Sequence, residues 1–398
     1  MPIPPTYPGV YIEEVPSGSH SIPGVPTSVT AFIDYFKQGP INKAIHIRNV
    51  GDFERTFGGL DARSEASYSI RQFFDNGGSE AWVVRTGDNP PNGAALIGSE
   101  HQKTGLYALG DADLFQILCI PRTAQISNCD PDRLSSSEAV DVIAAAIEYC
   151  ESRRAFFIVD IPNDNNCVDD IKKWVEDNRR FRHRNAALYF PRLQIADPLN
   201  SSRPRSIGAS GTMAGVYART DSSRGVWRLP AGSETALNGV LALDYNLNDA
   251  ENATLEVLAI NCLRTFPIYG LVAWGARTLE GSDQSVSEWR YIPVRRLGLF
   301  IEESLYRGTK WVVFEPNDEQ LWAQVRLAVG TFMHRLYLQG AFQGTTPSRA
   351  YFVKCDLETT TQDDINNGIV NILIGFAPLK PAEFVLIRIQ QIASCARS

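Results

Sequence analysis

The chain has 398 residues, of which 44% are hydrophobic and 21% charged, a balance typical of a folded globular protein with two or three domains. Its net charge of −7 argues against non-specific nucleic-acid binding, because that requires basic surface. No leader pattern opens the chain and no apolar run approaches the roughly 20 residues that span a bilayer, so we expect cytoplasmic assembly without membrane insertion. Seven cysteines without a CxxC pair predict reduced thiols, with neither disulfides nor zinc.

The first thirty residues are rich in Pro, Gly and Ser around one strand-like island, residues 7–14. Such an island cannot form a hairpin with its Pro and Gly flanks, so it must find partner strands elsewhere, as an extended arm does. The pattern then predicts a strand at 27–34, a helix at 49–57 with a left-handed glycine cap, a helix at 66–74 and a strand at 81–85.

Residues 86–105 are polar and contain Gly and Pro, as expected of a linker. Strands and helices alternate after it, and two consecutive βαβ units predict a parallel sheet covered by helices. A capping box, Ser135 with Glu138, opens the first of these helices. The predicted strands are 114–120, 156–161 and 186–190, the helices are 137–150 and 168–179, the basic run 179–184 is a solvated helix end, and 197–207 is an exposed loop.

The last third predicts an α+β domain with helices on one side of a sheet. Its clearest element is the amphipathic helix 319–338, whose apolar residues fall on one face. The other predicted elements are strands at 260–264, 269–274, 311–314, 350–355 and 369–376, and a helix at 294–306.

The chain ends in a strand-like tail, residues 380–391, in which apolar residues follow a period of two after Pro381. Left unpaired, such a strand is an aggregation hazard, so it must be covered. It either pairs inside its own subunit, which the pattern alone favours, or adds to a sheet of another chain.

Catalytic and ligand motifs are weak. No glycine-rich phosphate loop occurs. Residues 208–215 resemble the nucleophile motif of subtilisin-like proteases with the serine missing between Thr212 and Met213, and no histidine or acid motif completes a triad. The acidic residues 356–364 lack the spacing of a calcium loop and read as a solvated turn. We therefore expect no catalysis, cofactor or metal.

Long strings spread over the chain are similar to the contractile tail sheath family of phage tails, type VI secretion and extracellular contractile injection systems. These strings are residues 7–14 (YPGVYIEE), 73–78 (FFDNGG), 214–221 (AGVYARTD), 225–227 (GVW), 274–279 (WGARTL), 289–296 (WRYIPVRR), 375–378 (GFAP) and the tail itself. The resemblance is specific at both ends and in the last third, whereas the middle, about 90–205, resembles a subtilisin-like α/β fold without its triad.

The resemblance implies a multidomain sheath fold, α/β and α+β, with a subtilisin-like α/β middle domain lacking a triad and an α+β C-terminal domain. The implied divisions are an N-terminal arm (1–26), the first part of an inner domain (27–90), a variable outer α/β domain (91–207), the inner domain (208–379) and a C-terminal arm (380–398). The arms add strands to neighbours through Tyr7, Val10, Tyr11 and Ile12 at one end and through Phe384, Val385, Leu386, Ile387 and Ile389 at the other.

The implied function is a structural subunit that polymerises helically around an inner tube and contracts to drive the tube through a target envelope. The implied partners are other copies in stacked, hexameric rings, the tube protein, baseplate and tail terminator proteins, and sheath paralogues. Arg326, His334 and Arg335, on the polar face of helix 319–338, are predicted to face the tube. The alternatives are an active subtilisin-like hydrolase and another tail component such as a baseplate-proximal sheath paralogue.

Overall fold

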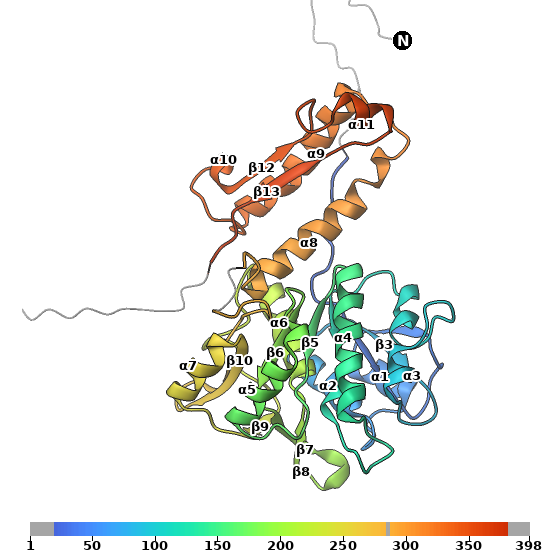
Figure 1. Cartoon of the computed structure of the whole chain (residues 1–398), viewed down its shortest axis with the longest axis vertical. Coiled ribbons are helices and arrows are strands. Elements are labelled where there is room, and N and C mark those ends of the chain that lie inside the picture. Colours follow the sequence, from blue (N-terminus) through green and yellow to red (C-terminus); the bar gives the residue numbers. More distant parts are fainter. Residues whose placement is uncertain (1–19, 284–286, 381–398) are drawn as a thin grey trace, which may run out of the picture.

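Two lobes connected by one long helix make up the molecule (Figure 1). The computed structural model describes residues 20–283 and 287–380. The larger lobe is an open sheet with helices on both faces. The smaller lobe holds residues 309–380, whereas the strands at 260–274, predicted in the same α+β domain, lie in the larger lobe. Helix α8, Ile292–Gly308, leads from one lobe into the other, and the segment before β1 runs beside it.

An eight-stranded sheet in the order β11-β10-β6-β5-β4-β1-β3-β2 forms the centre of the larger lobe. The strands from β10 to β3 are parallel, whereas the edge strands β11 and β2 are antiparallel to their neighbours. This confirms the predicted parallel sheet. The strands are β1 Thr30–Asp34, β2 Ala44–Ile47, β3 Ala81–Arg85, β4 Ile117–Cys119, β5 Phe156–Val159, β6 Ala186–Phe190, β10 Ile260–Phe266 and β11 Gly270–Ala273.

Helices cover both faces of this sheet because its central strands are apolar on both sides. In β5, Phe156 and Ile158 pack in the core beneath α1, α2 and α6, whereas Phe157 and Val159 pack in the core beneath α4, α5 and α7. The helices are α1 Val50–Phe57, α2 Glu65–Asp75, α3 Gly93–Ile97, α4 Ser136–Ser152, α5 Val168–Asp177, α6 Ser210–Arg224 and α7 Asp249–Val257, with 3₁₀ turns η1 Gly105–Asp111, η2 Pro121–Ala124 and η3 Arg179–Phe181.

The large sheet does not divide at residues 90 and 207, where the sequence analysis placed domain boundaries. Strand β1 pairs with both β3 and β4, so segments from either side of residue 90 share one ladder, and β10 joins them from beyond residue 207. The polar stretch taken for a linker is a surface crossover that contains α3 and η1. The layer that each part occupies in an assembly stays a prediction.

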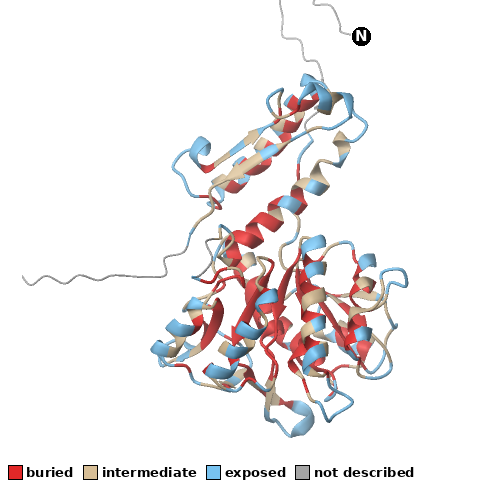
Figure 2. Cartoon of the chain, in the orientation of Figure 1, coloured by how far each residue is buried: buried red, intermediate tan, exposed pale blue. Residues whose placement is uncertain are grey.

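The smaller lobe has its own apolar core between α8, α9 and a two-stranded sheet. Helix α9, Glu319–Leu338, has the predicted bounds, and Trp322, Val329 and Phe332 pack against Leu297 and Ile301 of α8. Buried residues line the half of α8 that enters the larger lobe (Figure 2). The remaining elements are η5 Lys310–Val312, α10 Pro347–Ala350, β12 Tyr351–Lys354, α11 Gln362–Asn366 and β13 Leu373–Phe376. In the described ranges, every helix is too short or too polar to cross a membrane.

Two predicted segments differ from the structure. Residues 197–207, expected as a loop, form a hairpin of β7 Leu193–Asp197, η4 Pro198–Asn200 and β8 Arg203–Ile207, and β7 also pairs with β9 Val240–Leu243. Pro204 is tolerated there because β8 is an edge strand, where a missing N–H costs little. Residues 311–314, expected as a strand, form the end of η5 and a turn in which Phe314 is fully exposed at a φ of 76°.

The predicted helix signals at the two caps are confirmed. Gly58 ends α1 in the left-handed conformation, with its N–H bonded to the Glu54 carbonyl. Ser135 and Glu138 form the capping box of α4: the Ser135 hydroxyl accepts from the Glu138 amide, and the Glu138 carboxylate accepts from the Ser135 amide at 2.9 Å. These bonds lower the pKa of Glu138 below its ordinary value.

Ser135→Ala should lower the free energy of unfolding by about 0.5–2 kcal/mol, because it leaves the first amides of α4 without their side-chain acceptor. Urea unfolding followed by circular dichroism measures the loss. Ser152→Ala, at the other end of α4, removes an exposed hydroxyl that bonds only the Tyr149 carbonyl and serves as the matched control. Equal losses in the two variants would contradict the capping role.

Candidate functional site

Buried polar groups gather where the parallel strands end, which is the edge that binds ligands in open α/β sheets. Asp34 ends β1, Asp160 follows β5, Glu65 starts α2 and Ser210 starts α6. Asp160 accepts a hydrogen bond from the Ser210 amide at 2.8 Å and another from the Ser210 hydroxyl. Burial raises the pKa of Asp160 to about 6, with the Ser210 hydrogen bonds acting in the opposite direction.

Three arginines balance these carboxylates. Glu65 is fully buried, with Arg205 at 3.3 Å and Arg192 at 3.8 Å from its oxygens. Arg192 also donates to the carbonyls of Ala124 and Ile161, and Arg122 donates to the carbonyls of Arg63 and Asp132. The charges therefore hold the loops that follow β4, β5 and β6 to one another and to the connection between α1 and α2, as a structural network does.

The subtilisin-like string lies inside this network. Ser210 is fully buried and bonded to Asp160, and Thr212 donates to the Gln72 side chain at 3.3 Å. Gly208 is needed beside them, because a Cβ there would stand 2.4 Å from the Asp160 carboxylate. A serine or threonine nucleophile needs an adjacent base. Within the described ranges, Ser210 bonds Asp160 and Thr212 bonds Gln72, and neither of these partners is a histidine.

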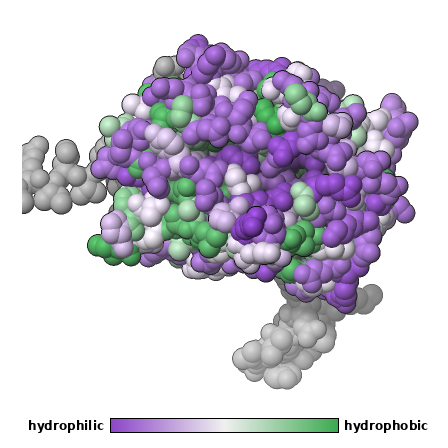
Figure 3. Space-filling model, turned by 90° about the horizontal axis from the view of Figure 1, so that it is seen from below, coloured by the Kyte–Doolittle hydropathy of each residue, from purple (hydrophilic) through white to green (hydrophobic). Residues whose placement is uncertain are grey.

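A shallow recess of about 330 Å³ opens beside the network, between residues 62–65, 122–133 and 205–206. It is lined by charged groups of both signs, several of which pair with one another, such as Arg133 with Asp130 at 3.2 Å. Figure 3 looks onto the end of the molecule that carries β7 and β8, and shows a mostly hydrophilic surface with separate hydrophobic patches. In the described residues, no group of three or more metal-binding side chains was found.

A different kind of site lies in the smaller lobe, where β12 and β13 form a two-stranded antiparallel ladder from Tyr351↔Phe376 to Lys354↔Leu373. One face packs on α9 through Tyr351 and Val353, while Phe352 and Leu373 remain half exposed on the other. In the described part of the chain, neither strand has a second ladder, and one isolated bridge, Phe342 to Pro378, lies beyond the end of β13. Open edges beside apolar side chains can accept further strands.

The predicted arm residues lie outside the described residues. They are Tyr7, Val10, Tyr11 and Ile12 before residue 20, and Phe384, Val385, Leu386, Ile387 and Ile389 after residue 380. Their strand donation therefore stays a prediction.

The basic residues predicted on one face of α9 interact with other residues of the same chain. Arg326 bonds Glu319 at 2.6 Å and the Cys355 carbonyl, and Nδ1 of His334 lies 3.2 Å from the Tyr351 hydroxyl. Arg335 donates to the Ile22 carbonyl at 2.6 Å, a contact between residues 313 positions apart that no local pattern signals. The residues that α9 leaves exposed along its length include Ala323, Leu327, Thr331 and Leu338, beside His334 and Arg335.

Comparison with known proteins identifies this fold. Residues 284–392 match the phage tail sheath C-terminal domain. The chain is 28% identical to a protein of the extracellular contractile injection system PVC sheath complex in the contracted state, with a TM-score of 0.76, over 97% of this chain and 98% of that one. The chain is thus similar to contractile sheath proteins over nearly its whole length. A protein of the anti-feeding prophage helical sheath in the contracted state is equally similar, at 28% identity and a TM-score of 0.74, over 97% and 99% of the two chains.

Curated sheath proteins of phages are longer than this chain. The tail sheath protein of Vibrio phage KVP40 is 26% identical over 339 residues, which is 76% of this chain and 50% of that protein. The tail sheath protein of Salmonella phage ViI is 27% identical over 225 residues, 56% and 33% of the two. The chain thus spans half the length, or less, of the curated sheath relatives that it matches.

Asp160→Asn should flatten part of the pH dependence of this protein's stability. The folded-state pKa of Asp160 is about 6, raised from 3.8, so its favourable contribution is present below about pH 4 and is lost as pH rises through 6. The variant, which does not ionise there, should gain roughly 1–3 kcal/mol relative to the wild type between pH 4 and pH 7. Urea unfolding at each pH measures this, and parallel pH curves for the two proteins would contradict it.

Proposed function

We propose that the chain is the structural subunit of a contractile sheath, which polymerises helically around an inner tube and contracts to drive the tube through a target envelope. The observation that carries the proposal is the similarity to contracted-state sheath proteins over nearly the whole chain, 97% in each case. The arrangement of the smaller lobe supports it, because an assembly of strand-exchanging subunits needs an acceptor sheet in every copy.

Sheet β12–β13 is the proposed acceptor. A donated strand of about nine residues makes several backbone hydrogen bonds worth roughly 0.5–1.5 kcal/mol net each, and it also covers apolar surface. Phe352 and Leu373 supply such surface on the exposed face. A head-to-tail contact of this kind that does not close in the plane of a ring propagates as a helix. Contraction then needs two lattice packings of different free energy and no nucleotide.

The proposed partners are further copies in stacked hexameric rings, an inner tube protein, baseplate and terminator proteins, and sheath paralogues. The proposed place of assembly is the cytoplasm, in a phage tail-like particle that is later released or membrane-anchored. A second candidate is a paralogue beside the baseplate. It is supported by the match to a chain of the anti-feeding prophage baseplate, 28% identical with a TM-score of 0.74 over 98% of this chain and all of that one. Gold labelling of this chain along purified particles separates the two positions.

Deleting residues 380–398 should leave a soluble, folded subunit that forms no long sheaths, because the arm is proposed to belong to the lattice and not to the subunit core. Negative-stain microscopy counts the sheaths, and thermal unfolding checks the monomer. Deleting only residues 392–398, which keeps the strand-like pattern of 380–391, is the matched control and should assemble normally. Normal sheaths from the longer deletion would end the proposal for this arm.

The solvent-exposed side of α9 is proposed to contact the tube. Arg326 and His334 lie at the margins of this side, and Arg335 bonds the Ile22 carbonyl. Weak, screened charge pairs of roughly 0.2–1 kcal/mol suit a contact that contraction has to break. The tube contact should therefore be tested by substituting the exposed residues of this side of α9, and not only its arginines.

Thr331→Glu should lower the proportion of extended, tube-filled sheaths at low salt, because it adds negative charge to the face proposed to meet an acidic tube, with partial recovery at high salt. Electron microscopy of assembled particles gives the proportion. Thr254→Glu is the matched control, since Thr254 is also an exposed helical threonine bonded to its own helix. If both variants keep wild-type proportions, α9 is not the tube contact.

A further inference from the structure

Residues 20–26, which we call the anchor segment, are held to the smaller lobe by side chains from two places. The His20 ring stacks on Trp311 of η5, with centroids 3.9 Å apart and planes 15° from parallel. Two residues further along the chain, the Ile22 carbonyl accepts the 2.6 Å hydrogen bond from Arg335 of α9. Hydrogen bonds to a charged donor are stronger than neutral ones, so this carbonyl has a firm partner.

Glycines allow the anchor segment to lie close against α8. Ile22 is buried, and a Cβ on Gly308 would stand 2.5 Å from its side chain. A Cβ on Gly24 would stand 2.9 Å from the Phe300 ring. The Val25 amide donates to the Ser304 hydroxyl at 3.1 Å. The segment is therefore fitted along the length of α8 and does not merely cross it.

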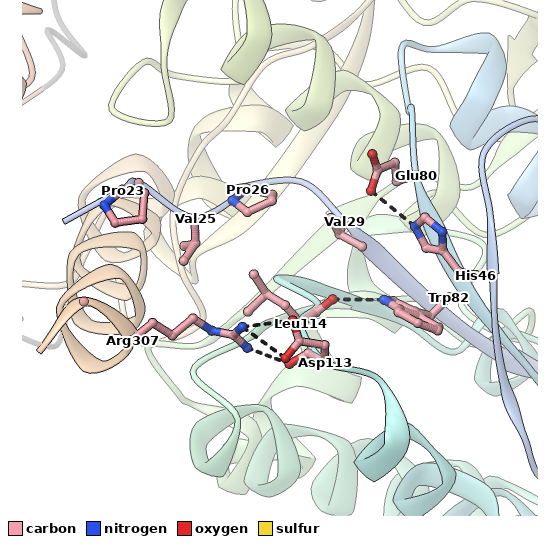
Figure 4. A pocket seen from close by; sticks show the side chains of 12 residues that line it. Pro23, Val25, Pro26, Val29, His46, Glu80, Trp82, Asp113, Leu114 and Arg307 are labelled. Carbon is pink, nitrogen blue, oxygen red and sulfur yellow. Dashed lines mark hydrogen bonds and ion pairs between the residues drawn. The ribbon is translucent and has the colours of Figure 1, made fainter. Parts of the chain in front are cut away.

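The anchor segment leads into the larger lobe over a groove. Figure 4 shows Pro23, Val25 and Pro26 on one side of this groove, with Trp82 and Leu114 on the other, and the groove has a volume of about 410 Å³. Arg307 of α8 pairs with Asp113 across it at 2.9 Å. Because both ends of the segment are fixed to protein, its start at residue 20 has a defined place on the smaller lobe.

We propose that the anchor segment positions the N-terminal arm: Arg335, Trp311 and Gly308 fix the point and direction at which residues 1–19 leave the subunit. The inference rests on the proposed function, in which that arm adds a strand to the sheet of a second copy. Arg335, although exposed, is then a positioning residue for assembly through its hydrogen bond to a carbonyl of its own subunit.

The physical reason for such an anchor is the length of chain that separates a donated strand from the body of its subunit. A donated strand finds its acceptor at an effective concentration that depends on the free length between them, and this concentration falls steeply as that length grows. Releasing residues 20–26 would lengthen the stretch between the proposed donor strand, residues 7–14, and the first held residue from 5 to 12 residues and remove its preferred direction. Assembly would then become slower and weaker while the acceptor and donor strands stayed intact.

Gly308→Ala is the sharpest test, because alanine is normally preferred to glycine in a helix, and only the contact with Ile22 opposes it. Gly330→Ala in α9 is the matched control, since a Cβ there meets nothing within 4 Å. Arg335→Gln, which removes the charge and keeps the helix, is the second variant. The Val25 amide reports release of the segment through hydrogen exchange, measured by mass spectrometry on the unassembled full-length subunit.

We expect exchange in peptides covering residues 22–27 to become about tenfold faster in Gly308→Ala and Arg335→Gln, a factor equivalent to 1.4 kcal/mol, and to be unchanged in Gly330→Ala. The concentration needed for sheath assembly should rise severalfold, by up to about fourfold, in the same two variants, with sheaths of normal diameter.

Unchanged exchange in both variants would overturn the anchor, and faster exchange with wild-type assembly would overturn its positioning role. If the wild type and Gly330→Ala form no sheaths at all, the proposed function fails instead, while the exchange data still decide whether the segment is held.

Discussion

The buried ion pair between Arg296 of α8 and Asp221 of α6 holds the architecture together. Both side chains are almost fully buried, at 3% and 4% exposure, and two hydrogen bonds of 2.6 and 2.9 Å join them. Thr27 completes the site, with its hydroxyl on Asp221 and its carbonyl on Arg296. Removing one member of such a pair leaves an uncompensated buried charge, which typically costs 3–5 kcal/mol. The segment before β1, α8 and α6 therefore meet at this ion pair. Substitutions at Thr27, Asp221 or Arg296 should be poorly tolerated.

The polar network at the carboxyl edge follows the same physical rule. Asp34 and Asp160 are fully buried, and burial raises the pKa of each above its ordinary value. Their hydrogen bonds come from amides and hydroxyls at the starts of α2 and α6, so the helix termini solvate the carboxylates in place of water. An edge that in other α/β proteins opens to a ligand is here closed by the protein's own groups.

Local patterns were sufficient for much of the fold and insufficient for the contacts that matter to assembly. Helix α9 and the capping box at Ser135 were predictable because periodicity and capping chemistry act over a few residues. The β7–β8 hairpin was missed because Pro204 and several serines suggest a loop, and only its place on a sheet edge makes the strand possible. The partner of Arg335 lies 313 positions away, so no local pattern indicates that this exposed side chain also bonds Ile22, and its place toward a tube stays a prediction. The predicted arm residues fall outside the described ranges, and their partners are proposed to be other copies.

Helix α8 contributes to two hydrophobic cores at once. Ile292 and Leu299 pack beneath the sheet of the larger lobe, while Leu297 and Ile301 pack with α9 in the smaller one. A cut between the lobes at either end of α8 would expose one of these faces to water, so neither lobe is an independent module. Heating should therefore unfold the two lobes together. Chimeras made between relatives should keep α8 intact, with insertions placed in surface loops such as that between β7 and β8 and not at the narrow junction between the lobes.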